Sequence, residues 1–288
     1  MDLDDNSSLN APLVKSPPTH PVRSSYSWIL YGLASGCLFG FGLYFLAEIS
    51  LHGAVFTRTI ISAGYLAFLV LYHTGVAWQR NRREGRCCSK HSSGLFKGEV
   101  FSFLRLLAFV MDGAIFTVHF SLSMLSMQYA LYAGINQGVI TCLFALGTFF
   151  LALMTFVFQG ERLRPHQLIG MVMLVLCVVV LGLSDLLSKE SSSIATEERV
   201  SVMVPIAFGL IGPFFYALRL FLVRKFAKQF GIEALHISTS GQAILEPVFL
   251  VTAIVLYTQG FYNQTDQILF LKGTLAGLFV GSGVVCLT

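Results

Sequence analysis

Three polar residues, Ser238, Gln242 and Glu246, recur every four positions in an otherwise apolar stretch. In an α-helix this spacing places the three side chains along one face. Hydrocarbon cannot satisfy a carboxylate, so in a membrane this face must point toward protein. Pro247 follows directly and removes a backbone hydrogen bond, which leaves the stretch locally polar and bendable. We interpret the stripe as the lining of a solute cavity, with packing between helices as the alternative.

Four more ionisable residues lie inside apolar runs, where each charge costs on the order of 2.5–3.5 kcal/mol and usually faces the bundle interior. Asp112 precedes His119 by seven residues, so both lie on one helical face, either lining a cavity and carrying protons or bonding between helices. Arg58 either belongs to the site or snorkels outward. We interpret Arg219 as an anchor near one end of its helix and Glu48 as solvated.

Further polar residues flank these runs. Tyr216 follows Gly212-Pro213, a pair that we expect to break helical regularity. Asn136 lies near the end of its run and either faces the same cavity or bonds between helices. The candidate pocket residues are thus Arg58, Asp112, His119, Asn136, Tyr216, Ser238, Gln242 and Glu246. The sequence contains no nucleotide-binding loop, metal-ligand cluster or catalytic triad, so we expect no catalytic residue, no metal and no cofactor.

The elements that must position these residues are membrane helices. Of the 288 residues, 55% are hydrophobic and 12% charged, and the mean hydropathy is +0.72. Soluble domains carry about 25% charged residues. Only helices satisfy the backbone in lipid at the lengths found here, which predicts an all-α polytopic bundle. The eight expected spans are 28–48, 54–76, 104–126, 131–158, 165–187, 203–223, 236–258 and 268–288.

Lys and Arg predict the orientation. Fourteen lie on the side of the N-terminus and three on the other side, which indicates a cytosolic N-terminus in an integral multi-pass protein of the plasma membrane or an endomembrane. Residues 1–25 are polar and rich in Pro and Ser, and we interpret them as a disordered cytosolic tail. Residues 188–202 form the expected extracytosolic loop.

A weak internal repeat appears at an offset of 177 residues, which aligns Gly32 with Gly209 and Gly64 with Gly241. The first span starts in the cytosol and the sixth outside, so the two copies are expected to be inverted. We assign residues 28–187 to a first five-helix unit and 203–288 to an incomplete second unit. The sequence ends at Thr288 within an apolar run, and we expect at least one further helix beyond it.

The segment "FQGERLRPHQLIG" (158–170) forms a short turn between two expected spans. Its Gly160, Glu161 and Arg162, followed by Gln167 and Gly170, resemble the region between the fourth and fifth helices of EamA-type units in the drug/metabolite transporter superfamily. Arg58 also resembles an arginine common early in the second helix of that family. The resemblance implies a ten-helix inverted-repeat transporter. From the residues themselves, we favour a connector and topology anchor over a substrate contact for this turn.

These features favour a secondary transporter that moves a small organic solute by alternating access. A nucleotide-sugar or sugar-phosphate antiporter of an endomembrane is an alternative, and a non-transporting receptor or scaffold is a second one. The expected partners are the solute and the lipid bilayer, with a homodimer as an option. Basic residues lie in short loops between spans, so no nucleic-acid partner is expected.

The orientation can be tested by labelling in intact cells. A membrane-impermeant thiol reagent should reach Cys87 and Cys88 only after permeabilisation, because their loop belongs to the basic side. An epitope tag inserted at Ser193 should be accessible without permeabilisation. The reverse pattern would overturn both the orientation and the inverted relation of the two units.

Overall fold

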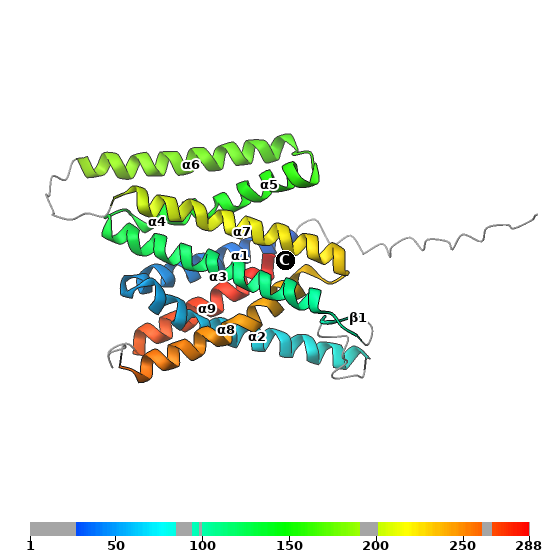
Figure 1. The fold of residues 1–288 in the computed structure, drawn as a ribbon. Helices are drawn as coiled ribbons and strands as arrows, with labels where there is room; N and C mark the ends of the chain where they lie inside the picture. The colour runs from blue at the N-terminus through cyan, green and yellow to red at the C-terminus, as the bar shows by residue number, and fades with distance from the viewer. Residues whose placement is uncertain (1–26, 85–93, 98–99, 191–200, 261–266, 288) are drawn as a thin grey trace, which may run out of the picture.

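The computed structural model describes residues 27–84, 94–97, 100–190, 201–260 and 267–287, which are almost entirely helical (Figure 1). The tail, the Cys87–Cys88 loop and most of the loop at 188–202 lie outside the described residues. The first half contains α1 (Ser27–Ile49), the 3-10 turn η1 (Ser50–His52), α2 (Ala54–Glu84), the strands β1 (Phe96–Lys97) and β2 (Val100–Phe101), and α3 (Phe103–Tyr132). It is followed by α4 (Gln137–Phe144), α5 (Leu146–Gln159), α6 (Pro165–Glu190), α7 (Met203–Phe230), α8 (Ala234–Thr258) and α9 (Gln267–Leu287).

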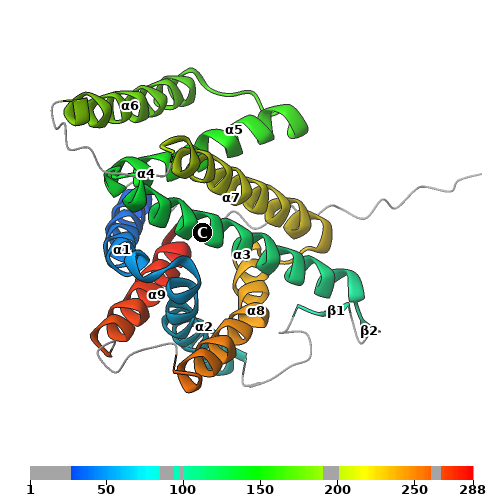
Figure 2. The ribbon, with the colours of Figure 1, turned by 60° about the vertical axis from the view of Figure 1, so that its left-hand side comes forward.

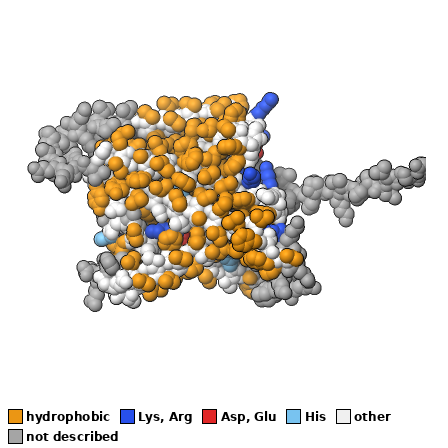
Figure 3. Space-filling model, in the orientation of Figure 1, with side chains coloured by type: hydrophobic (Ala, Val, Ile, Leu, Met, Phe, Trp, Pro, Cys, Tyr) orange, Lys and Arg blue, Asp and Glu red, His pale blue; other side chains and the backbone are white. Residues whose placement is uncertain are grey.

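The described helices have the length and composition of membrane spans. Six segments are long and apolar enough to cross a bilayer: Leu30–Ile49, Val55–Gln79, Phe103–Tyr132, Gln137–Gln159, Met203–Phe230 and Ala234–Thr258. Gln167–Val180 and Gln267–Gly283 are shorter apolar helices. Figure 3 shows a mostly hydrophobic face, with Lys and Arg mainly along one end of it. The fold is therefore that of an all-α, multi-pass integral membrane protein, as the composition predicts.

All eight expected spans lie on helices, but the sites of irregularity differ from those expected. Helix α7 continues through Gly212-Pro213, so the break predicted there was wrong. Helix α8 continues through Pro247. The span expected at 131–158 begins instead at Gln137 and is divided at Ala145 into α4 and α5. Just after this division, a Cβ on Gly147 would lie 3.1 Å from the Tyr216 ring, so α5 approaches α7 closely there.

Helix α3 lies in the middle of the bundle, between α7 and α8 (Figure 2). It runs antiparallel to α7. Near the end of α3, Ser126 Oγ donates to the carbonyl of Pro205 at the start of α7 (2.7 Å). Nearer the start of α3, Asp112 pairs with Arg219, which lies later in α7. Helix α9 packs against α1 and α2, antiparallel to α1 and parallel to α2. Helix α6 lies at the edge in both views and touches α4 and α5.

Two groups of three helices are built alike, α1–α2–α9 and α7–α8–α3. Ser35 Oγ of α1 donates to the Gly283 carbonyl of α9 (2.9 Å), and His119 of α3 bonds the Gly212 carbonyl of α7 (2.9 Å). Gly212 lies 177 residues after Ser35, which is the offset of the internal repeat and relates α1 to α7. Gly283 lies 164 residues after His119, and the same offset of 164 relates Gly113 of α3 to Gly277 of α9. The two contacts therefore occupy equivalent places in the two groups.

Glycine pairs mark equivalent crossings in the two groups. A Cβ on Gly64 would lie 1.8 Å from the Thr274 carbonyl oxygen, and one on Gly277 would lie 2.3 Å from that of Ile61. In the other group, a Cβ on Gly241 or on Gly113 would lie 2.5 Å from backbone oxygen of the facing helix. Small residues let membrane helices approach this closely, so these crossings fix the depth at which α2 meets α9 and α8 meets α3.

The close crossing makes a prediction for Gly64. The Gly64→Ala substitution should lower the stability of the purified protein by about 1–3 kcal/mol or more, because the added methyl group overlaps the backbone of α9. Gly75→Ala is a matched control on the same helix, since nothing lies within 4 Å of its added Cβ. Thermal unfolding in detergent should separate the two variants, and equal melting temperatures would contradict the crossing.

Candidate functional site

The polar stripe of α8 is buried. Ser238, Gln242 and Glu246 retain 5%, 1% and 1% of their accessible surface, which confirms that this face points into the bundle. Successive stripe residues lie about 6 Å apart along the helix axis. Each one bonds a side chain from another helix. We call the stripe and its partners the polar column, which consists of Ser238, Gln242, Glu246, Asp112, Arg219, Tyr65 and Arg58.

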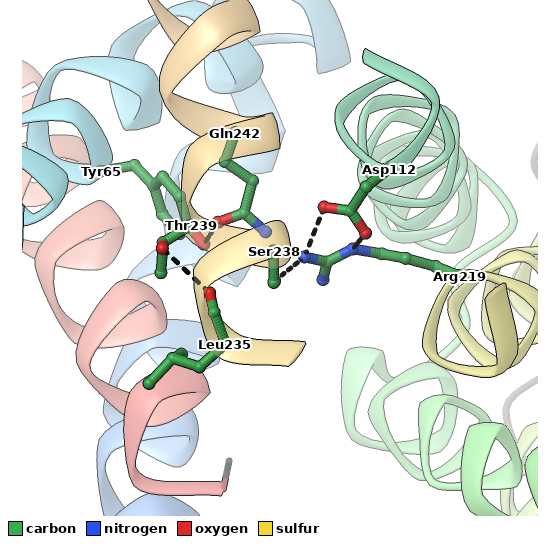
Figure 4. Close-up of polar contacts among 7 residues, drawn as sticks. All are labelled: Tyr65, Asp112, Arg219, Leu235, Ser238, Thr239 and Gln242. Atoms are coloured by element: carbon green, nitrogen blue, oxygen red, sulfur yellow. Dashed lines mark hydrogen bonds and ion pairs between the residues drawn. The ribbon is translucent and has the colours of Figure 1, made fainter. Parts of the chain in front are cut away.

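The first level of the column joins three helices at Arg219 (Figure 4). Its Nε donates to Asp112 Oδ1 (2.8 Å) and its Nη2 to Asp112 Oδ2 (3.2 Å). Nη2 also donates to the Ser238 hydroxyl. The guanidinium carbon lies 4.7 Å from the centre of the Phe116 ring. A planar guanidinium suits this two-point contact with a carboxylate, which fixes α3, α7 and α8 relative to one another.

The middle level is a hydrogen bond between two neutral side chains. The Tyr65 hydroxyl of α2 donates to Gln242 Oε1 of α8 (Figure 4). These residues lie 177 residues apart, which is the offset of the internal repeat, so α2 and α8 meet at equivalent positions. The amide nitrogen of Gln242 is buried and has no hydrogen-bond partner among the described residues. It is a donor with unused capacity in the middle of the column.

The third level is a second two-point ion pair. Arg58 Nη1 donates to Glu246 Oε2 (3.0 Å) and Nη2 donates to Oε1 (2.8 Å). The guanidinium carbon lies 3.9 Å from the centre of the Phe249 ring. Arg58 keeps only 4% of its accessible surface, so it does not snorkel toward water but belongs to the site. Its Nε is buried without a partner among the described residues.

The column balances its charges internally. The two arginines and two carboxylates retain between 1% and 4% of their surface, and each cation has one anion. Removing a single partner would leave a buried charge with nothing to compensate it, which costs far more than the pair contributes. Among the described residues, no group of three or more His, Cys, Asp and Glu is placed to hold a metal ion.

His119 and Tyr216 lie beside the first level. His119 Nδ1 bonds the Gly212 carbonyl, which can only accept, so Nδ1 carries the proton. The His119 ring lies 5.1 Å from the Tyr216 ring. Asp112 and His119 do face α7 together, but each bonds a different group on α7 and no hydrogen bond joins them within the described chain.

Asn136 lies outside the column. It is exposed, and its side chain accepts a hydrogen bond from Gly138 N (2.8 Å) as the N-cap of α4. Its predicted place in the cavity was therefore wrong, because capping the free backbone N–H groups of α4 takes up its oxygen. Glu48, expected to be solvated, is part-exposed and pairs with Lys272.

The turn at Gly160 is explained by backbone geometry. Gly160 has φ +66° and ends α5, where Gly160 N donates to the Phe156 carbonyl and Glu161 N to that of Thr155. This is an αL termination, in which the bond from Gly160 N to the Phe156 carbonyl closes the last turn, and its left-handed φ favours glycine. Gln167 Oε1 accepts from Arg164 N (2.8 Å) and caps α6. These contacts agree with the predicted connector role, and Glu161 and Arg162 are both exposed.

The sequence interpretation missed Arg219 and Tyr65. Arg219 lies closer to the C-terminal end of α7, which resembles an anchoring position, yet it retains only 1% of its surface because α3 and α8 cover it. The repeat could have identified Tyr65, since the aligned pair Gly64 and Gly241 immediately precedes Tyr65 and Gln242. The aromatic residues under the guanidiniums gave no signal, because phenylalanine is common throughout the chain.

Comparisons with protein-family models, with curated proteins and with solved structures found no match for this chain.

The ion pair at the first level can be tested by removing its charges one at a time and together. Arg219→Gln should destabilise the protein by about 3–5 kcal/mol, because it leaves the Asp112 carboxylate buried and unpaired. The double variant Asp112→Asn/Arg219→Gln should recover part of this loss. Arg224→Gln, an exposed position on the same helix, is the control. Additive losses in the double variant, measured by thermal unfolding, would contradict the pairing.

Proposed function

We propose that this protein is a secondary transporter that moves a small organic solute across the membrane by alternating access, with the polar column as its solute site. The observation that supports this most is the position of the column. The column lies where α2 meets α8, and these two helices occupy equivalent positions in the two helix groups. Four ionisable side chains are buried together there. Intramembrane ionisable residues on facing helices are typical of substrate and ion pathways.

The two ion pairs are suited to act as gates. Arg58–Glu246 lies on one side of the Tyr65–Gln242 contact along α8, and Arg219–Asp112 with Ser238 lies on the other. In the proposed cycle one pair opens while the other stays closed, so that the solute never meets an open path through the bundle. A solute can drive such an exchange only if it binds one state better than the other.

The middle of the column offers the first contact for a solute. The Gln242 amide nitrogen, which has no partner in the part of the chain that the structure describes, is a hydrogen-bond donor between the two gates, and the Tyr65 hydroxyl lies beside it. A solute that carries an acceptor oxygen satisfies this buried donor, and an unsatisfied donor is costly in a low-dielectric site. The resemblance of residues 158–170 to EamA-type units and the paired helix groups agree with a transporter of the drug/metabolite superfamily.

The proposal is tested by counterflow in proteoliposomes with a panel of labelled amino acids, nucleosides, sugars and nucleotide sugars. For a panel member that exchanges, Glu246→Gln should reduce exchange or change its pH dependence, because Arg58 loses its carboxylate partner. Gln242→Ala should raise the KM, because the solute loses its donor.

Glu233→Gln makes the same chemical change at an exposed position at the start of α8, and it should leave exchange unchanged. If both column variants exchanged like the wild type after correction for reconstituted amount, the column would be packing between helices. Failure of every panel member would favour the receptor or scaffold alternative.

A further inference from the structure

A separate polar cleft of about 510 Å³ shares no residue with the column and lies between α5, the turn to α6, the first turn of α6, and α7. Its floor is formed by one face of α5, and its rim is formed by the turn and by one residue of α7. The residues that define it chemically are Thr155, Glu161, Arg162, Arg164, Gln167 and Arg224. We call it the arginine cleft.

Three guanidinium groups from two separate elements surround this cleft. Arg162, Arg164 and Arg224 are exposed, and none of them forms an ion pair within the described part of the chain. Glu161 also lines the cleft, so its walls carry a net charge of about +2 at neutral pH. Arginine binds phosphate oxygens with two parallel hydrogen bonds, which makes an anion with several such oxygens the fitting occupant.

The turn holds two of these arginines in fixed places. The left-handed termination of α5 at Gly160 and the Gln167 cap at Arg164 define the backbone at the two ends of the turn. Arg164 is the N-cap of α6, where the positive end of the helix dipole adds to its charge. The Thr155 hydroxyl donates to the Ala152 carbonyl, so the guanidiniums are the strongest donors facing the cleft.

The cleft lies at the boundary between apolar and polar surface. Phe156, Val157 and Phe158 immediately precede the turn and are 49%, 62% and 72% exposed. Leu168 and Ile169 follow it on α6 and are also exposed. Helices α5 and α6 touch at few points, so acyl chains can lie along this surface. The excess of Lys and Arg in the sequence places this boundary at the cytosolic leaflet, which carries anionic lipids.

We propose that the arginine cleft binds the phosphate-bearing head group of an anionic phospholipid in the cytosolic leaflet, with its acyl chains against α5 and α6. The head group supplies the negative charge that the three guanidiniums lack, and the exposed aromatic and aliphatic side chains supply the contact for the chains. This site is independent of the proposed solute pathway, because it shares no residue with the polar column.

The experiment measures binding of acyl-labelled phosphatidylinositol 4-phosphate to the full chain in phosphatidylcholine nanodiscs. Arg162→Gln/Arg164→Gln/Arg224→Gln should weaken binding by at least about tenfold, because the phosphate groups lose the two-point hydrogen bonds that guanidinium groups in the cleft provide. The matched control, Arg82→Gln/Lys225→Gln/Lys228→Gln, removes the same charge from exposed positions outside the cleft and should change binding by less than about threefold. Arg224→Lys keeps the charge without the planar fork and should weaken binding by a smaller amount.

Four outcomes would overturn the proposal. Equal loss in the two triple variants would indicate general surface attraction, and no loss in the cleft variant would remove the site. Competition by inorganic phosphate or glycerophosphate at the concentration of the lipid would indicate a soluble anion as the occupant. Equal binding of labelled phosphatidylcholine would show that charge does not matter. Unchanged melting temperatures confirm that the exposed substitutions leave the fold intact.

Discussion

The structure depends on the pairing of buried charges within a bundle surrounded by lipid. Arg58, Asp112, Arg219 and Glu246 have almost no access to solvent, so each needs its partner wherever the helices are placed. Arg219 connects α7 to α3 and, through Ser238, to α8, while Arg58 connects α2 to α8. Two ion pairs therefore fix the rotation of four helices about their axes. The glycine crossings then fix how closely the helices approach.

The charges are asymmetric within a frame that is nearly symmetric. The positions equivalent to Arg219 and Asp112 in the other helix group are Gly42 and Ala276, which pack together without charge. Those equivalent to Arg58 and Glu246 are two leucines. The two groups thus share matching crossings, while the buried charges differ, with Arg58 in one group and Asp112, Arg219 and Glu246 in the other. The Tyr65–Gln242 bond lies where the two copies meet, with one ion pair on each side of it.

Sequence reasoning succeeded where a local pattern determines the outcome and failed where packing determines it. The four-residue spacing of Ser238, Gln242 and Glu246 was enough to predict a buried face, because a carboxylate cannot face lipid. The burial of Arg219 depends on α3 and α8, which no local pattern near Arg219 encodes. The division at Ala145 could not be predicted, because neither Ala145 nor its immediate neighbours in the chain are proline or another helix breaker. The resemblance to EamA-type units stays a prediction.

Helix α7 carries both of the polar features proposed here to bind ligands. Arg219 faces the column, and Arg224, five residues later, lines the arginine cleft. Five residues correspond to about 140° around a helix, so the two side chains point to different sides of α7. The column is electrically balanced, so in the proposed transport cycle a solute has to exchange partners with an existing pair. The cleft carries unbalanced positive charge and attracts its occupant. The two proposed sites therefore use different sides of the same helix and share no residue.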